Sequence, residues 1–141
     1  MKGAIVDSCV LLDVLTEDPQ WFGWSSGALA AAADRGLLVI NPVIYAEVSI
    51  GFERIEDLEA ALPEAFVVMH PISREAAFLA GKAFLQYRRR GGSRTTPLPD
   101  FLIGAHAAVA NLPLVTRDAA RFRSYFPSIE LIEPSRSGHQ S

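Results

Sequence analysis

The chain has 141 residues, of which 50% are hydrophobic and 21% charged, and its formal net charge is −3. This length is typical of one domain with its own core, and the apolar content excludes a disordered protein. The weakly acidic charge gives no general electrostatic indication of nucleic-acid binding. The single cysteine, Cys9, excludes an internal disulfide and a zinc site built from several cysteines, and it fits a reducing cytoplasm.

Two segments bear on location. Residues 101–115 are largely apolar, but they contain His106, Asn111 and Pro113 and are shorter than the about 20 apolar residues of a membrane span. Near the start of the chain, Asp7 stands where a signal peptide would continue its apolar run. We therefore expect a cytoplasmic protein that is neither exported nor held in a membrane.

Predicted strands and helices alternate along the chain. Short apolar runs predict strands, and caps, apolar periodicity and Gly or Pro stops predict helices. In chain order, we expect a strand at 4–6, helices at 10–15 and 25–35, a strand at 37–40, helices at 42–51 and 55–62, a strand at 66–69, a helix at 74–90, a loop at 93–99, a helix at 100–111, a strand at 114–116, a helix at 119–122 and a strand at 129–132.

This alternation predicts an α/β fold. About five strands would form a mainly parallel sheet, covered on both faces by helices in a three-layer α/β/α arrangement. One domain is expected over residues 1–133, followed by a flexible tail at 134–141.

Four acidic residues lie near predicted strand ends. Asp7 ends the first strand, and Asp118 follows the strand at 114–116. Glu47 lies in the helix that leaves the second strand, and Asp100 opens a helix after a proline-containing loop. Ligands of open α/β sheets bind beyond the carboxyl ends of the strands, so we expect these carboxylates to gather at one rim.

Carboxylates that gather in a cleft repel one another and favour a hard divalent cation, Mg²⁺ or Mn²⁺. Such a metal generates a hydroxide nucleophile and neutralises a scissile phosphate, so the predicted chemistry is metal-assisted phosphodiester hydrolysis. Each acid also has a structural explanation. Asp100 and Asp118 are typical of helix N-termini, and Glu47 would be stable in solvent.

Four local segments resemble the motifs of PIN-domain ribonucleases. They are Ile5-Val6-Asp7-Ser8 with Leu11-Leu12, Asn41-Pro42-Val43-Ile44-Tyr45-Ala46-Glu47-Val48, Pro99-Asp100-Phe101-Leu102-Ile103-Gly104-Ala105-His106-Ala107, and Leu114-Val115-Thr116-Arg117-Asp118 followed by Phe122. The resemblance covers about residues 2–134, and the size of the chain is similar to that of the VapC-like toxins of toxin–antitoxin pairs. It implies a PIN-like domain that acts as a Mg²⁺-dependent endoribonuclease and is held inactive by a cognate antitoxin.

The resemblance also implies a role for each matching residue. Asp7 and Asp100 match the positions that contact the metal most directly, and Asp118 matches the acid that completes the metal site. Glu47 matches the remaining acid of that site, which helps to orient metal-bound water. Thr116 matches a hydroxyl position beside the site, where it would hold a water or a phosphate oxygen. A homodimer is a further implication of the family.

Arginines suggest how an acidic protein binds RNA. One group precedes the Asp100 helix and consists of Arg88, Arg89, Arg90 and Arg94. Arg117 stands apart, between Thr116 and Asp118. We expect these side chains to contact RNA phosphates at the rim of the site. The alternatives are a solvated helix end for the group, and for Arg117 an ion pair with a site acid or an outward orientation.

Several other residues have two interpretations. His106 is either a general base or a packed or partner-facing histidine, and Cys9 is either a nucleophile or a small buried thiol. Trp21, Phe22 and Trp24 crowd one segment, where they would form a groove for an antitoxin helix or complete the core or a dimer face.

Other enzyme classes with acids at strand ends do not fit. A haloacid-dehalogenase-like enzyme needs a second Asp two residues after the first, where this chain has Cys9. A receiver domain needs a Lys after a late strand, and the only lysines are Lys2 and Lys82. Two alternatives to an endoribonuclease toxin remain open: a non-catalytic PIN-like module that binds RNA or protein, and a housekeeping RNA-processing nuclease of the same fold.

Overall fold

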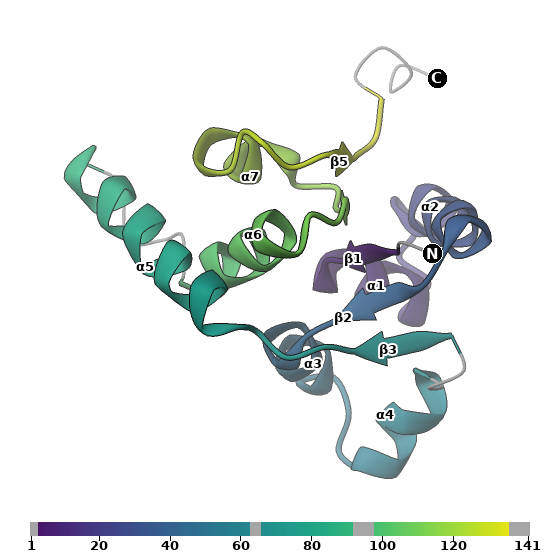
Figure 1. Cartoon of the computed structure of the whole chain (residues 1–141). Helices are drawn as coiled ribbons and strands as arrows, with labels where there is room; N and C mark the ends of the chain where they lie inside the picture. Colours follow the sequence, from purple (N-terminus) through teal and green to yellow (C-terminus); the bar gives the residue numbers. More distant parts are fainter. Residues whose placement is uncertain (1–2, 63–65, 92–97, 136–141) are drawn as a thin grey trace.

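The computed structural model describes residues 3–62, 66–91 and 98–135. Five strands and seven helices lie in this part of the chain (Figure 1). The strands are β1 (Ala4–Val6), β2 (Leu38–Ile40), β3 (Val67–Met69), β4 (Leu114–Val115) and β5 (Leu131–Ile132). The helices are α1 (Ser8–Leu15), α2 (Phe22–Arg35), α3 (Pro42–Ser49), α4 (Ile55–Ala61), α5 (Arg74–Arg89), α6 (Leu98–Ala110) and α7 (Ala119–Tyr125).

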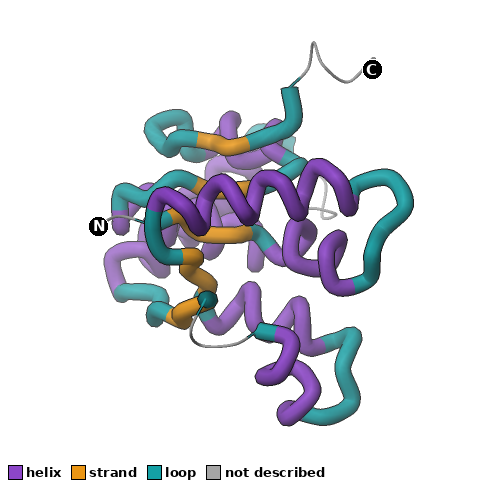
Figure 2. The backbone as a smooth tube through the Cα atoms, turned by 90° about the vertical axis from the view of Figure 1, so that its right-hand side faces the viewer, coloured by secondary structure: helices purple, strands orange, loops and turns teal. Residues whose placement is uncertain are grey.

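The strands form one sheet in the order β3-β2-β1-β4-β5. Each neighbouring pair is parallel, so the expected mainly parallel, about five-stranded sheet is confirmed. Figure 2 shows the strands one above another, with helices beside them. The chain runs outward from β1 to β2 and β3, then returns to the other side of β1 to form β4 and β5. The strand order therefore reverses between β1 and β4, which is where sheets of this kind bind ligands.

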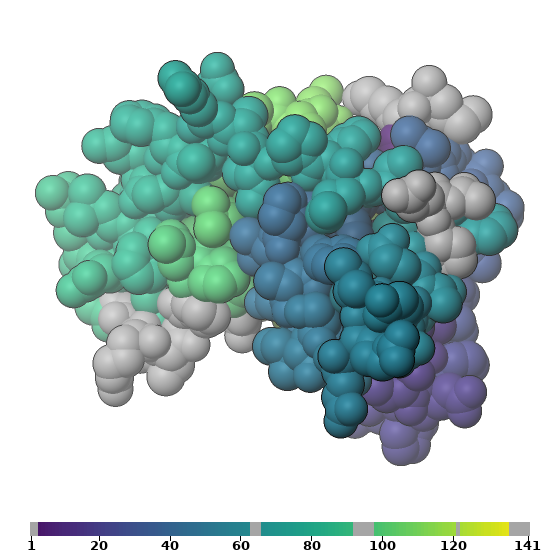
Figure 3. All heavy atoms as spheres, turned by 90° about the horizontal axis from the view of Figure 1, so that it is seen from below, coloured from purple at the N-terminus to yellow at the C-terminus, as the bar shows by residue number. Residues whose placement is uncertain are grey.

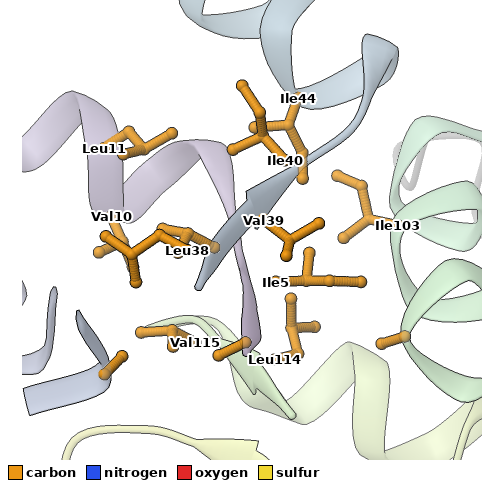
Figure 4. Close-up of a cluster of buried hydrophobic side chains, with 14 of the residues drawn as sticks. Ile5, Val10, Leu11, Leu38, Val39, Ile40, Ile44, Ile103, Leu114 and Val115 are labelled. Atoms are coloured by element: carbon orange, nitrogen blue, oxygen red, sulfur yellow. The ribbon is translucent and has the colours of Figure 1, made fainter. Parts of the chain in front are cut away.

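The central strands are apolar and buried throughout. Every residue of β1, β2 and β4 is buried, as helices on both faces of a parallel sheet require. Val10 and Leu11 of α1 approach the strand side chains from one side, and Ile103 of α6 approaches from the other (Figure 4). The three-layer arrangement thus buries Ile5 and Leu114 completely at the centre of the sheet.

A second cluster joins the helices of the C-terminal half. Phe84 and Tyr87 of α5 pack on Phe101 of α6, with ring centroids 5.4 and 5.5 Å from that of Phe101. Gly104 lets α6 approach the residue that follows α7, because a Cβ at this position would lie 2.5 Å from the ring of Phe126. These contacts hold α5 and α6 side by side, with α5 forming an outer edge of the molecule (Figure 3).

Side-chain caps at Asn41 and Ser73 begin α3 and α5. The Asn41 side chain accepts the backbone N–H of Ile44, Pro42 occupies the first turn of α3, and the Ser73 hydroxyl accepts the N–H of Ala76. A cap at Asp7 was not expected: α1 begins directly after it, at Ser8 rather than at residue 10.

Other predicted boundaries were wrong by a few residues. α2 begins at Phe22 instead of residue 25, because the Asp18 side chain accepts the N–H groups of Gln20 and Trp21 and turns the chain into the helix early. α6 begins at Leu98, since a proline fits the first turn of a helix, so residues 98 and 99 are helical rather than loop. The strand expected at 129–132 is shorter and covers only Leu131–Ile132.

Residues 92–97 and 136–141, which include most of the predicted loop and most of the predicted tail, lie outside the described residues. Within the described part of the chain, no helix is both long and apolar enough to cross a lipid bilayer.

Candidate metal centre

Asp7 lies at the carboxyl end of β1, in the middle of the sheet, and only 6% of its surface is exposed. Its Oδ1 accepts the N–H of Ser8 at 2.8 Å, and its Oδ2 accepts the hydroxyl of Thr116 at 2.8 Å and the thiol of Cys9 at 3.5 Å. Burial raises the pKa of this carboxyl from an ordinary 3.8 to about 6; the hydrogen bonds lower it, and the charge of Asp100 raises it. The fold therefore holds a carboxylate where its negative charge is poorly solvated.

Thr116 connects the ends of β1 and β4. Its hydroxyl donates to Asp7 and accepts the backbone N–H of Asp118 at 3.1 Å. Asp118 is exposed and occupies the position before α7, but its side chain makes no capping hydrogen bond. The alternative role of Asp118 as a side-chain helix cap is therefore not realised.

Glu47 lies on α3 and is tied to α1 beside Asp7. Its Oε1 accepts the hydroxyl of Ser8 at 2.7 Å, although the two residues are 39 positions apart. Ser8 thus contributes its backbone N–H to Asp7 and its side chain to Glu47. We did not predict this role for Ser8, and the only signal in the sequence was its place directly after the first acid.

Asp100 lies in the first turn of α6 and is half-buried. Its negative charge adds to the effect of burial in raising the pKa of Asp7. All four predicted acids thus lie around the end of β1, linked to Asp7 directly or through Ser8, Thr116 or their charge.

The four acids are not assembled at ligand distances. Within the described residues, no three Asp, Glu, His or Cys side chains are close enough to hold a metal ion as they stand. Hydrogen bonds hold Asp7 to Thr116 and Glu47 to Ser8. The four acids are therefore arranged more loosely around Asp7 than a set of ligands to one ion would be.

The chemistry of these donors fits a hard divalent cation. Asp7 is a buried carboxylate whose recorded donors, within the described part of the chain, are a backbone amide, a hydroxyl and a thiol, all of them neutral. A nearby second carboxylate, Asp100, adds to the negative potential. Carboxylate and hydroxyl oxygens are the ligands that Mg²⁺ and Mn²⁺ prefer, and a cation here would offset the cost of the buried charge.

Arg117 makes an ion pair that we did not predict. Its Nε and Nη2 donate to the two carboxylate oxygens of Asp13 at 2.7 and 2.9 Å, and its guanidinium lies 5.2 Å from the ring centroid of Trp21. Asp13 is buried and also accepts the hydroxyl of Ser25 at 2.7 Å. Arg117 therefore pairs with an acid outside the predicted site. The only feature of the sequence that could have pointed to Asp13 is that it is a charged residue within an otherwise apolar helix.

The predicted arginine group lies at the end of α5. Arg88, Arg89 and Arg90 are exposed, and Arg94 lies outside the described residues. The guanidinium of Arg88 lies 6.0 Å from the ring centroid of Phe84, and that of Arg90 lies 5.4 Å from that of Tyr125. The guanidinium groups of Arg88 and Arg90 thus lie over aromatic rings while both side chains stay exposed.

For both Cys9 and His106, the structure favours the structural interpretation over the catalytic one. Burial and the charge of Asp7 raise the pKa of the Cys9 thiol to about 12, so the thiol stays protonated rather than acting as a nucleophile. His106 is buried in α6 and hydrogen-bonded to Asn41, as expected of a packed histidine.

The aromatic segment is divided between core and surface. Trp24 is half-buried and packs against the main core, Trp21 lies beneath Arg117, and Phe22 is 40% exposed. Core packing therefore accounts for Trp24, whereas Phe22 is left at the surface.

Comparisons with known proteins place these features in context. A family model described as the PIN domain matches residues 4–125. A solved VapBC2 complex from Rickettsia felis, bound to a DNA fragment from its promoter, has a chain that superposes with a TM-score of 0.72 at 18% identity, covering 94% of this chain and 98% of that chain.

Two further solved complexes contain similar chains. A toxin–antitoxin complex from Klebsiella pneumoniae gives a TM-score of 0.66 at 20% identity, covering 94% of this chain and 97% of that chain. FitAcB from Neisseria gonorrhoeae gives 0.69 at 15% identity, covering 91% and 95%. A comparison with curated proteins found no match. At these identities the structural likeness establishes the fold.

Proposed function

The chain belongs to the PIN domain family, whose members are typically nucleases, and from this premise we propose that it is a Mg²⁺- or Mn²⁺-dependent endoribonuclease. The observation that carries the proposal is the environment of Asp7. A carboxylate buried at the end of the central strand, with a raised pKa and a second carboxylate nearby, is the arrangement that a bound cation would stabilise.

The chain offers a set of oxygen donors for this cation. Asp7 and Asp100 would bind it, Asp118 would complete its coordination, and Glu47 would orient a water beside it. When bound, such a metal lowers the pKa of a water and neutralises charge on the scissile phosphate. Thr116 fixes the Asp7 carboxylate through its hydroxyl hydrogen and holds the backbone of Asp118 through its oxygen.

The RNA would approach over the end of α5. The arginines are exposed at the end of α5, which packs against α6, the helix that carries Asp100. Such side chains bind phosphates irrespective of base sequence. Arg117 contributes less to this proposal, because two of its donors are bound to Asp13.

We infer further that the chain is the toxin of a toxin–antitoxin pair and forms a homodimer. Its structural neighbours are VapC and FitB toxins in complexes with antitoxins, which suggests an antitoxin partner for this chain. The exposed Phe22, beside Trp21, is where an apolar antitoxin segment would find a contact.

Cleavage of cellular RNA tests the nuclease proposal. The purified chain, free of partner, is incubated with total RNA in Mg²⁺, in Mn²⁺ or in EDTA. We expect discrete fragments with either metal, none in EDTA, and a loss of at least about a hundredfold in Asp7→Asn and Asp100→Asn. Asp57→Asn, which changes an exposed acid on α4, is the matched control and should cleave normally.

The other outcomes have definite meanings. Cleavage that persists in Asp7→Asn and Asp100→Asn would contradict the assigned site. Binding of RNA without cleavage under every condition would identify a non-catalytic module. Cleavage without growth arrest on expression of the chain would favour a housekeeping nuclease over a toxin.

A further inference from the structure

Asn41 and His106 form a buried hydrogen bond between α3 and α6. Asn41 Nδ2 and His106 Nδ1 are 3.0 Å apart, and 0% of Asn41 and 5% of His106 are exposed. The bond joins residues 65 positions apart, one directly before α3 and one on α6, and both helices also place apolar side chains such as Ile44 and Ile103 in the main core. A buried polar contact of this kind fixes relative position, since either partner alone would be left unsatisfied.

The helix cap at Asn41 determines the direction of this hydrogen bond. Asn41 Oδ1 accepts the backbone N–H of Ile44 at 2.9 Å, so the amide cannot be turned over without losing the cap of α3. The group that faces His106 is therefore the NH₂, which is a donor. His106 Nδ1 must accept, and the neutral ring then carries its hydrogen on Nε2.

The two helices joined here carry two of the four acids. Asn41 precedes α3, which presents Glu47 to Ser8, and His106 lies on α6, which begins with Asp100. Glu47 and Asp100 approach Asp7 from these separate helices, so their separation depends on the position of α3 relative to α6. The Asn41–His106 bond sets that position from the buried side.

We propose that His106 is a positioning residue: as the neutral Nε2–H tautomer it binds Asn41 and holds α3 and α6 where Glu47 and Asp100 flank Asp7. This inference rests on the proposed metal site. The surroundings of the ring agree with it, because burial and the nearby His70 lower the pKa of His106 and keep its ring neutral. A protonated ring would place an N–H against the Asn41 NH₂ group.

NMR measures the tautomer directly, in the wild-type chain. We expect the ¹⁵N shifts of His106 at neutral pH to give an unprotonated Nδ1 and a protonated Nε2. In Asn41→Asp, one carboxylate oxygen keeps the cap of α3 and the other faces Nδ1, so Nδ1 should become protonated. A hydrogen on Nδ1 in the wild-type chain would overturn the proposal, and this measurement needs no substitution of His106.

Mn²⁺ binding, followed by electron paramagnetic resonance, tests the consequence for the site. We expect His106→Ala to weaken Mn²⁺ binding about tenfold and His106→Asn, whose amide oxygen can replace Nδ1 as acceptor, to restore it to within about twofold. Asp57→Asn, a change at an exposed position on α4, is the control and should bind as the wild type does.

These binding measurements distinguish a failure of this inference from a failure of the proposed function on which it rests. Normal Mn²⁺ binding in His106→Ala, with weakened binding in Asp100→Asn, would overturn the positioning role and leave the metal site standing. Unchanged binding in both variants would overturn the proposed metal site and the inference with it. Weakened binding in His106→Asn equal to that in His106→Ala would show that packing of the ring, rather than its hydrogen bond, matters.

Discussion

Thr116 donates its hydroxyl hydrogen to Asp7 Oδ2 across 2.8 Å, although 109 positions separate the two residues. The bond crosses from the end of β4 to the end of β1, where the order of the strands reverses. Because the same hydroxyl oxygen accepts the N–H of Asp118, one side chain holds both the buried acid and the loop that carries the exposed one. Thr116 is thus the residue that links these two acids of the candidate site.

The buried Asp7 should make stability depend on pH. Its pKa is about 6 in the folded chain and near 3.8 when exposed, so the folded chain binds more protons between these values. The free energy of unfolding should therefore fall as pH rises from about 4 to about 6 and level off above, by on the order of 3 kcal/mol. Urea unfolding in EDTA at several pH values measures this.

Asp7→Asn provides the comparison, because an amide does not titrate. The difference in stability between this variant and the wild type should grow in favour of the variant over the same pH range. Parallel pH profiles for the two proteins would contradict the assignment of a raised pKa to Asp7.

The Asp13–Arg117 ion pair should be important for stability. Asp13→Ala removes the partner of a partly buried guanidinium and the acceptor of the buried Ser25 hydroxyl, so we expect the free energy of unfolding to fall by roughly 2–4 kcal/mol. Arg54→Ala breaks a pair whose side chains are 68% exposed and should cost less than about 1 kcal/mol. Denaturant unfolding of both variants checks this, and equal losses would refute it.

Gly104 should not tolerate a side chain. In Gly104→Ala the new methyl group would lie 2.5 Å from the ring of Phe126, so α6 or the ring must shift, at a cost of about 1–3 kcal/mol. Gly81 on α5 has open space around it, and Gly81→Ala should instead stabilise the chain by about 0.5–1 kcal/mol. Melting temperatures should move in opposite directions for the two variants, and a shift of the same sign would argue against this packing.

The α5 arginines should account for much of the salt dependence of RNA binding. Replacing all three by glutamine should weaken the binding of a single-stranded RNA and reduce the slope of log K against log salt by about two, at about 0.7 per phosphate contact. Fluorescence anisotropy in EDTA measures binding without cleavage. A charge-matched control replaces three exposed arginines elsewhere, Arg35, Arg54 and Arg74. Equal effects of the two triple substitutions would mean that net charge, not this location, governs binding.

Much of the fold could be predicted because its signals are local. Apolar runs such as residues 4–6 and 38–40 are buried strands, and Asn41 with Pro42 starts a helix in any context. Several of the errors fell at helix starts. Phe22 and Leu98 begin helices earlier than expected because a side-chain turn at Asp18 and a proline in a first turn permit it.

The candidate site was harder to predict, because its contacts join distant parts of the chain. The ends of the predicted strands pointed to Asp7, which directly follows β1, and to Asp118, which lies two residues beyond the strand expected at 114–116. The bonds of Ser8 to Glu47 and of Arg117 to Asp13 depend on how helices lie against one another, which no local pattern in one sequence reveals.

The place of β1 at the centre of the sheet has a consequence for synthesis of the chain. β1 is synthesised well before β4, and its register with β4 is completed only by Leu114 and Val115. A growing polypeptide therefore holds Asp7 without Thr116 or Asp118 until β4 and the residues directly after it have left the ribosome. Pairing between such distant segments forms late in folding. A nascent chain that ends before β4 would lack the assembled centre, so any activity of that centre would begin only after these residues have been made.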